Sequence, residues 1–377
     1  MKKYVILFCL TILLVPMSVK ANTQLDLKAK SAILMDYDSG EILYSKDATK
    51  KHYPASMTKM MSLLLIYEKI NSRDIKYEDE VRISKEAAAM GGSQIWAYEG
   101  EALSVKDLLY ASIIASANDA IYALAEYSYG SADKFVAKMN EKAKELKLSN
   151  TNFVNPTGLH DDNHYSCAKD MAIISRELIR VGSNKLLDIT SKYDAYIREG
   201  DKKFWLVNTN KLLKLYEGVD GLKTGFTQQS KYCISITAKR NNLRLISVVM
   251  GEEDTKIRNR EIIQMLDYGF NNYESYKLVN KNDILKTIRK DELIPSKIDI
   301  RALDDVYITK KKNEKIKISN IEETLDYDEL PYTKNKQIGS AIIKYGRFKK
   351  TIRLTTNEDI KKLDLFSVLK RCFNNLV

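Results

Sequence analysis

The sequence predicts an α+β protein, in which a central antiparallel sheet flanked by helices, with a mainly helical insert, precedes a small β-rich domain. Strand patterns near the start of the chain return after a long helical middle, which favours one antiparallel sheet built from both ends. After about Asn272 the helix patterns fade, charged residues become dense, and only short strand patterns remain. We predict four parts, at residues 1–21, 22–272, 273–356 and 357–377.

The first 21 residues have the pattern of a secretory signal peptide. Met1-Lys2-Lys3 gives a positive start, Tyr4–Met17 is apolar and nearly uncharged, and Val19-Lys20-Ala21 resembles a cleavage site. An uncleaved membrane anchor is the alternative, but the apolar run is shorter than the ~20 residues that a spanning helix needs. We therefore expect an exported protein whose mature chain begins near Asn22.

The first elements of the main domain are predicted to be a β-hairpin and a buried helix. Ser31–Tyr37 alternates apolar and polar residues, Asp38-Ser39-Gly40 supplies a turn, and Glu41–Ser45 returns. The next segment, Met57–Ile70, is apolar on most sides, which is typical of a buried helix.

Five further helices are predicted from the apolar periodicity, and two of them begin at a capping serine. Ser104 has an acid, Asp107, three residues further on, and Ser131 precedes another helical pattern. The helices are expected at Ser104–Ile114, Asp119–Tyr127, Ser131–Leu146, Lys169–Val181 and Ile257–Phe270.

Strands return in the second half of the chain. Tyr232–Lys239 and Leu243–Met250, joined at Asn241-Asn242, predict a hairpin of long buried strands. In the β-rich domain, strands are expected at Asp305–Thr309, Lys315–Ile318, Gly339–Lys344 and Lys350–Leu354, the last two paired through Tyr345-Gly346-Arg347.

Residues 357–377 have the pattern of an amphipathic helix with a basic polar face. Its apolar residues recur every three or four positions, at Ile360, Leu363, Phe366, Leu369, Phe373 and Leu376. Lys361, Lys362, Lys370 and Arg371 lie off this stripe. Such a helix can dock on its own domain, and it also suits an anionic membrane surface, which we predict as its partner.

Charge and cysteine content narrow the class of protein. Of the formal charge of +11, Lys2, Lys3 and Lys20 lie in the predicted signal peptide, which leaves +8 for the mature chain. This excess indicates a lysine-rich solvated surface or attraction to an anionic surface, and no nucleic-acid motif accompanies it. Three mature cysteines without a C-x-x-C pair, and three histidines in all, predict neither a disulfide framework nor a zinc site.

The segment Ser56-Met57-Thr58-Lys59 carries a nucleophile and a base. A spacing of three residues on a helix puts Ser56 and Lys59 on one face, and a serine hydroxyl needs a base to become nucleophilic. Lysine acts as a base only when it is neutral, and its apolar neighbours favour the burial that lowers its pKa. The helix start would also direct backbone N–H groups at an oxyanion.

Two further motifs supply the remaining groups for acyl transfer. Ser116-Ala117-Asn118 falls at a break between two apolar helices, where Ser116 could relay a proton and Asn118 could hold Lys59 and an amide. Ordinary turn chemistry would also explain these residues. Lys223-Thr224-Gly225 lies on a predicted strand, where Lys223, Thr224 and Thr227 could bind a carboxylate and Gly225 would leave room for a ligand.

The three motifs match the active-site set of penicillin-binding proteins and serine β-lactamases. The segments around them resemble the low-molecular-mass serine D-Ala-D-Ala carboxypeptidases: Pro54–Lys59, Ser116–Ala120, Phe153–Leu159 and Asp220–Thr227. The resemblance implies a transpeptidase-like domain. It also implies removal of the terminal D-alanine from peptidoglycan stem peptides, and acylation by β-lactam antibiotics. The predicted signal peptide and basic tail would place this domain at the outer face of the cytoplasmic membrane.

The resemblance also implies residue roles. Ser56 would be the acyl-ester nucleophile and Lys59 its base, with Ser116 and Asn118 as shuttle and positioning residues. Lys223, Thr224 and Thr227 would bind the terminal carboxylate. The backbone N–H groups of Ser56 and Phe226 would form the oxyanion hole, and Asp170 matches a position near the site. No metal or organic cofactor is implied.

Two other functions use the same fold. A class A β-lactamase needs a glutamate loop for fast deacylation, and residues 119–222 contain no E-x-x-x-N motif. A non-catalytic penicillin- or wall-binding module would have lost Ser56, Lys59 or Lys223, and all three are present. One departure from many relatives is Ser230-Lys231, in place of Ala-Gly, which puts the substrate preference in doubt.

Overall fold

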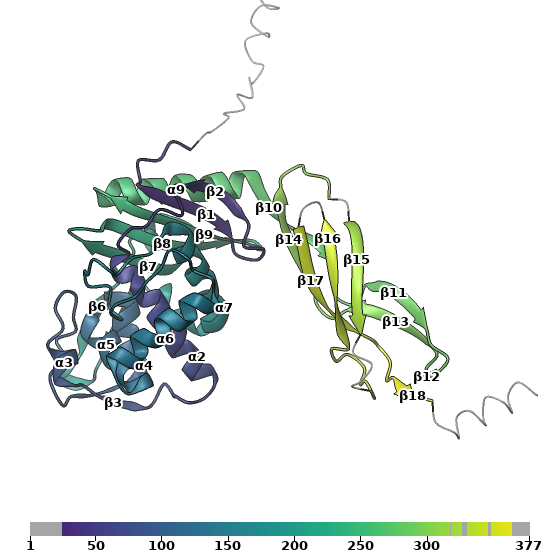
Figure 1. Cartoon of the computed structure of the whole chain (residues 1–377), viewed down its shortest axis with the longest axis horizontal. Coiled ribbons are helices and arrows are strands. Elements are labelled where there is room, and N and C mark those ends of the chain that lie inside the picture. The colour runs from purple at the N-terminus through teal and green to yellow at the C-terminus, as the bar shows by residue number, and fades with distance from the viewer. Residues whose placement is uncertain (1–24, 317, 326–329, 346–347, 364–377) are drawn as a thin grey trace, which may run out of the picture.

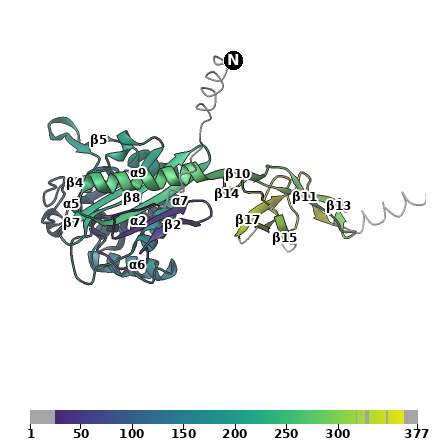
Figure 2. The same ribbon diagram turned by 90° about the horizontal axis from the view of Figure 1, so that it is seen from above.

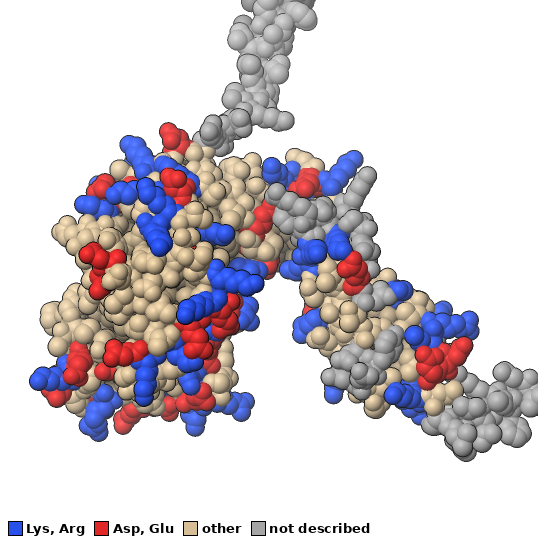
Figure 3. Space-filling model, viewed as in Figure 1, with Lys and Arg blue, Asp and Glu red and all other residues tan. Residues whose placement is uncertain are grey.

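The computed structural model describes residues 25–363, except 317, 326–329 and 346–347 (Figure 1). The predicted signal peptide and the predicted C-terminal helix beyond Leu363 lie outside the described residues. Within the described ranges, no helix combines the length and the apolar character needed to cross a membrane. On the face seen in Figure 3, basic and acidic side chains are interspersed, as on an ordinary solvated surface.

A five-stranded antiparallel sheet forms the centre of the main domain, as the sequence predicted. Its strands are arranged in the order β2-β1-β9-β8-β7. Their bounds are β1 Ser31–Asp36, β2 Ile42–Lys46, β7 Val219–Thr227, β8 Lys231–Arg240 and β9 Leu243–Glu252. The hairpins β1–β2 and β8–β9 confirm the predicted pairs. Strand β7, which carries the third motif, is therefore at an open edge of the sheet.

Helices cover both faces of this sheet (Figures 1 and 2). On one face lies α9 (Thr255–Asn272), whose Ile262, Met265 and Leu266 are buried in one apolar core. A larger apolar core lies on the other face, where α2 (Lys59–Asn71) and α7 (Ala168–Thr190) are buried together. Because both faces are covered, the strands carry near-continuous runs of buried residues rather than a strict alternation.

The helical insert confirms the predicted caps. The hydroxyls of Ser104 and Ser131 accept hydrogen bonds from the backbone N–H groups of Asp107 and Lys134. The insert contains α3 Lys85–Ala88, α4 Val105–Tyr110, the π-helical η2 Ala111–Ala115, α5 Asn118–Tyr129 and α6 Ala132–Glu145. Two short ribbons complete the domain: β3 Glu80–Arg82 with β4 Ala102–Ser104, and β5 Asp194–Ile197 with β6 Phe204–Val207, followed by α8 Leu212–Leu215.

The β-rich part begins directly after α9. Its main sheet has the order β11-β13-β17-β16-β15, and β10 pairs separately with β14. The bounds are β10 Tyr273–Val279, β11 Ile284–Arg289, β13 Lys297–Ala302, β14 Val306–Lys311, β15 Ile318–Leu325, β16 Gly339–Tyr345 and β17 Phe348–Thr355. Pairing of β16 with β17 confirms the predicted hairpin. Strands β10, β11 and β13 were not predicted, because their exposed positions are densely charged.

The start of the predicted C-terminal helix is wrong. Lys361–Lys362 form β18, which pairs with β12 (Leu293–Ile294), and Ile360 forms a bridge with Tyr332. Ile360 is buried in the core of the β-rich part. Packing of this one apolar side chain therefore outweighs the helical period at the start of the segment.

One buried hydrogen bond ties the two parts of the molecule together. The Thr309 hydroxyl on β14 donates to the carboxylate of Asp36 on β1, at 2.7 Å. The other carboxylate oxygen of Asp36 accepts hydrogen bonds from the backbone and hydroxyl of Ser39. The β-rich part thus lies against the end of the sheet that carries the β1–β2 and β8–β9 turns.

Candidate active site

Ser56 lies on a short 3-10 helix, η1 (Ala55–Thr58), that precedes α2. The α-helix therefore begins at Lys59, two residues later than the predicted Met57, although the Ser56–Lys59 spacing still brings the two side chains together. The η1 helix packs on β7 at Gly225, where a Cβ atom would lie 2.8 Å from the Pro54 carbonyl oxygen and 3.2 Å from the Met57 nitrogen. Gly225 thus makes room for the helix that carries Ser56. It also lines the cleft, so the predicted room for a ligand stays a prediction.

Lys59 is fully buried and donates three hydrogen bonds. Its Nζ lies 3.1 Å from Ser56 Oγ, 2.6 Å from Asn118 Oδ1 and 2.7 Å from the carbonyl oxygen of Thr157. The sequence alone assigned no role to Thr157, although its segment, Phe153–Leu159, is one of those that resemble the carboxypeptidases. This arrangement directs the Lys59 Nζ atom, whether it is protonated or neutral, at the Ser56 hydroxyl.

Burial lowers the pKa of Lys59 well below its ordinary value, and the nearby cation of Lys223 lowers it further. The carboxylate of Asp119 raises the pKa of Lys59, but this effect is smaller than the other two. Burial, the larger cause, is the one that the sequence predicted. Lys59 is therefore placed and tuned to accept a proton from Ser56.

Ser116 and Asn118 lie where the π-helical segment η2 gives way to α5. Ser116 adopts a left-handed backbone conformation, with φ of +63°, and its side chain faces the cleft. Asn118 donates its side-chain amide to the Gly91 carbonyl at 2.6 Å and its backbone N–H to the Ser93 carbonyl at 2.7 Å. The second motif therefore also fixes the loop that forms one wall of the cleft.

The third motif lies on the edge strand β7, close to the first two. Lys223 is buried, and burial lowers its pKa to about 7. The Thr224 hydroxyl donates to the Thr209 hydroxyl at 2.7 Å. Phe226 stacks on Tyr232 with ring centroids 4.5 Å apart, and Thr227 exchanges hydrogen bonds with Ser230 at the turn after β7.

These elements enclose a cleft of about 450 Å³. It is lined by Ser56, Ser93, Ser116, Thr209, Lys211, Thr224, Gly225, Phe226, Tyr232, Thr255, Arg258 and Asn259. Arg258, which sequence reasoning missed, is buried, and burial lowers its pKa to about 10. Its guanidinium donates to Asn259 Oδ1, and no carboxylate of the described residues lies within ion-pair distance. A buried cation without an acidic partner in a cleft is suited to an anionic ligand.

Comparison with known proteins agrees with this geometry. The family profile for D-alanyl-D-alanine carboxypeptidases matches residues 18–254. The chain belongs to the D-alanyl-D-alanine carboxypeptidase family. Over 93% of its length it is 42% identical to the D-alanyl-D-alanine carboxypeptidase DacF of Bacillus subtilis, and the match covers 91% of that relative.

Solved structures of penicillin-binding proteins share the fold. Penicillin-binding protein 5 from Haemophilus influenzae is 32% identical, with a TM-score of 0.71 over 89% of this chain and 98% of that one. Penicillin-binding protein D2 from Listeria monocytogenes, solved with ampicillin bound, is also 32% identical, with a TM-score of 0.59 over 65% of this chain and 98% of that one. The protein is therefore a serine-type D-Ala-D-Ala carboxypeptidase with a penicillin-binding-protein fold.

Two residues of this carboxypeptidase lie away from the cleft. The Asp170 carboxylate, at the start of α7, accepts hydrogen bonds from the Asn150 backbone and the Thr151 hydroxyl, so its contacts are with the loop before Thr157. Lys231 forms an ion pair with Glu253, with the Nζ and Oε2 atoms 3.3 Å apart. In the described residues, no group of three or more metal-ligating side chains is arranged to hold a metal ion.

We expect Gly158→Ala to lower both stability and activity of this carboxypeptidase. Gly158 has φ of +85°, and a Cβ atom there would lie 1.9 Å from the Ala55 carbonyl oxygen, beside the nucleophile. Relief of that clash must displace either η1 or the Thr157 carbonyl that binds Lys59. We expect kcat/KM to fall at least about tenfold and the free energy of unfolding to fall by about 2 kcal/mol or more.

Gly130→Ala is the matched control for this variant. Gly130 has φ of +82°, and a Cβ atom there meets nothing within 4 Å. The Gly130→Ala variant therefore introduces the same backbone strain as Gly158→Ala but no steric clash. Urea denaturation and D-alanine release should separate the two variants, and equal losses in both would contradict the role of the Ala55 contact.

Proposed function

We propose that Ser56 cleaves the D-Ala-D-Ala bond of peptidoglycan stem pentapeptides through an acyl-serine intermediate. The observation that carries this proposal is the contact of the buried Lys59 amine with Ser56 Oγ, at 3.1 Å. Ser56 Oγ attacks the carbonyl carbon of the penultimate D-alanine and gives its proton to neutral Lys59. The backbone N–H groups of Ser56 and Phe226 hold the oxyanion, since Gly225 keeps β7 against η1.

Collapse of the tetrahedral intermediate breaks the C–N bond. The proton on Lys59 passes to the leaving amine through the Ser116 hydroxyl, and D-alanine departs. Ser116 forms no hydrogen bond with Lys59 Nζ in this structure, so this relay requires the two side chains to come together when the substrate binds. A water molecule then attacks the Ser56 ester, gives its proton to Lys59, and the Ser56 oxygen is reprotonated as the shortened peptide leaves. Asn118 keeps Lys59 in place throughout, because its Oδ1 lies 2.6 Å from Nζ.

The cationic side of the cleft binds the terminal carboxylate of the substrate. Arg258 and Thr224 line the cleft, and Arg258 supplies buried positive charge there. Lys223 is buried behind this wall, where its Nζ donates to the Thr224 carbonyl oxygen at 3.1 Å. Hydrogen bonds from buried cations to a carboxylate are strong and directional. Thr227 acts through the turn that it closes with Ser230. β-Lactams, which also carry a carboxylate beside a reactive amide, acylate Ser56 at the same place.

The function is tested by incubating the purified protein with a soluble pentapeptide that ends in D-Ala-D-Ala. We expect release of one D-alanine per peptide and stable labelling by a fluorescent penicillin. Rapid turnover of the chromogenic cephalosporin nitrocefin, without D-alanine release, would instead identify a β-lactamase. Labelling without either turnover would identify a non-catalytic penicillin-binding module.

Export and attachment to the outer face of the cytoplasmic membrane are part of the proposal, supported by the pattern of residues 1–21 and the basic amphipathic pattern near the C-terminus. Since β18 belongs to the β-rich part, the test is a truncation after Leu363. We expect the truncated protein to move from the membrane fraction to the soluble fraction and to keep its activity on soluble peptide. Retention of the truncated protein on membranes would contradict this attachment.

A further inference from the structure

Both tryptophans of the chain lie at the surface close to the cleft. Trp96 is 71% exposed and Trp205 is 55% exposed, and two tyrosines of the same region, Tyr98 and Tyr196, are 54% and 56% exposed. Exposing large aromatic rings to water is unfavourable, and a cluster of them marks a binding surface. We define the aromatic ledge as these four residues together with Lys202 and Lys203.

The β5–β6 ribbon presents half of the ledge on one face. Tyr196 on β5 lies directly opposite Trp205 on β6, so their side chains share a face of the ribbon. The alternate residues Ile197 and Leu206 are buried in the large core. The ribbon is therefore fixed by its inner face, and its aromatic outer face is left to solvent.

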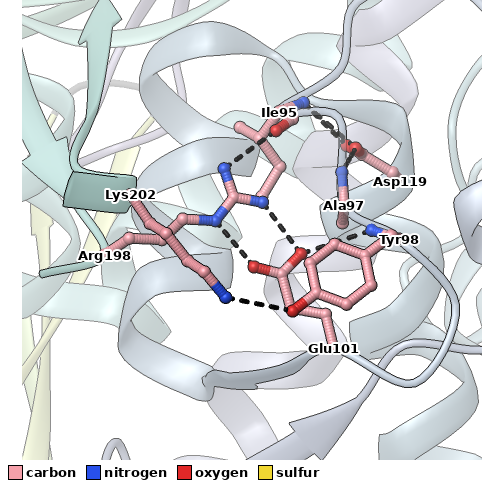
Figure 4. A network of polar contacts seen from close by, with 7 residues as sticks. All are labelled: Ile95, Ala97, Tyr98, Glu101, Asp119, Arg198 and Lys202. Carbon is pink, nitrogen blue, oxygen red and sulfur yellow. Dashed lines mark hydrogen bonds and ion pairs between the residues drawn. The ribbon is translucent and has the colours of Figure 1, made fainter.

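Polar contacts join this ribbon to the loop that carries the other half (Figure 4). The Arg198 guanidinium donates to both carboxylate oxygens of Glu101, at 2.8 and 2.9 Å, and to the Ile95 carbonyl at 3.0 Å. Lys202 Nζ lies 3.3 Å from the Tyr98 hydroxyl. Two segments about 100 residues apart in sequence thus form one continuous surface.

The loop is held in a strained conformation that keeps Trp96 exposed. Trp96 has φ of +56°, which a bulky residue rarely adopts. The Asp119 carboxylate accepts hydrogen bonds from Ile95 and Ala97, the residues on either side of it, at 3.0 and 3.1 Å. Strain of this kind persists where the surroundings fix it, and it is concentrated at functional sites.

The ledge is close to the active-site cleft along both of its segments. Ser93, three residues before Trp96, and Thr209, two residues after the end of β6, both line the cleft. The ledge is also cationic, since Lys203 Nζ lies 4.1 Å from the ring centroid of Tyr196 and Lys202 Nζ lies 5.5 Å from that of Tyr98.

We propose that the aromatic ledge binds the glycan strand of peptidoglycan while a stem peptide of that strand occupies the cleft. This inference rests on the proposed function, because it takes the substrate to be a peptide attached to a polysaccharide. The apolar faces of pyranose rings stack on aromatic side chains, and the tyrosine hydroxyls and lysines can hydrogen-bond to sugar hydroxyls and N-acetyl groups. A strand that bears the bound peptide must pass close to the cleft, where the ledge lies.

The position of the ledge favours a glycan over a membrane. Figures 1 and 2 place β6 and β5 at the end of the molecule farthest from the β-rich part. The segment proposed to meet the membrane begins after β18, and β18 itself lies at the opposite end of the long axis (Figure 1). The ledge is therefore far from the proposed point of membrane attachment.

The first test compares polymeric and soluble substrates for a Tyr196→Ala/Trp205→Ala variant. On pentapeptide-rich peptidoglycan we expect kcat/KM to fall at least about tenfold, as for loss of two central aromatic contacts. On the soluble pentapeptide kcat/KM should stay within about twofold. The control is Tyr276→Ala, which removes an exposed tyrosine beside a lysine, Lys310, in the β-rich part.

The second test measures binding directly by tryptophan fluorescence. Glycan strands stripped of their peptides by an amidase should shift the emission of the wild-type protein to shorter wavelengths and protect it from acrylamide. No spectral change with these strands, or equal losses on both substrates in the variant, would overturn the proposal. Loss of binding to anionic phospholipid vesicles in the variant, with glycan binding unchanged, would also overturn it. Cleavage of soluble pentapeptide by the wild type reports separately on the proposed function.

Discussion

Ser56→Ala is expected to abolish D-alanine release and labelling by a fluorescent penicillin. Among the described residues, no other hydroxyl forms a hydrogen bond with Lys59 Nζ, so removing the Ser56 oxygen leaves no activated nucleophile. We expect kcat/KM to fall by about 10⁴ or more, as in other serine enzymes that lose the attacking oxygen. The measurements are a D-alanine assay and gel fluorescence after labelling.

The fold of this variant should survive. Lys59 keeps its hydrogen bonds to Asn118 and Thr157, and the lost bond accounts for only about 1 kcal/mol. Ser72→Ala, at an exposed serine just after α2, is the control and should label like the wild type. Undiminished labelling of Ser56→Ala would refute the assignment of the nucleophile.

Lys59→Met is expected to produce the second largest loss, about 10³-fold or more in acylation, because it removes the base and keeps a side chain of similar length. Lys59→Arg should fail equally, since a guanidinium does not become neutral in the working pH range. Lys69→Met, in the last turn of the same helix, where the lysine is half-buried and forms an ion pair with Asp74, is the matched control. Acylation by Lys59→Arg at the wild-type rate would show that a fixed positive charge, rather than a base, is needed.

The same pair of lysines predicts the pH dependence of the wild-type enzyme. Acylation requires neutral Lys59, so kcat/KM falls toward acid pH, as Lys59 gains its proton below the pKa that burial has lowered. Carboxylate binding requires charged Lys223, so kcat/KM also falls as pH rises through its pKa of about 7. The profile should be bell-shaped. Lys223→Arg should lose the fall at alkaline pH, because a guanidinium stays charged there. Stopped-flow measurements of acylation over a series of pH values can detect this change.

Local patterns predicted the elements whose causes are themselves local. The caps at Ser104 and Ser131, the buried helix before Ile70 and the long hairpin β8–β9 depend on residues a few positions apart. The β-rich part was predicted less well, because its strands carry many charged residues and some pair with partners far along the chain, as β13 does with β17. Ile360 shows where prediction from local patterns fails. It fits the helical spacing of the C-terminal segment, but it forms a β-bridge with Tyr332 instead.

The sequence by itself determined the chemistry: a serine and a lysine three residues apart, a Ser-x-Asn motif and a Lys-Thr-Gly strand, and with them the carboxypeptidase family. Tertiary structure alone decided how these groups meet, because the pKa of Lys59 depends on burial and on Lys223, 164 positions away. It also placed Arg258 in the cleft and joined Trp96 to Trp205 across the aromatic ledge. Such contacts arise only when the sheet and its helices close around one site, since no local pattern specifies which distant residues pack together.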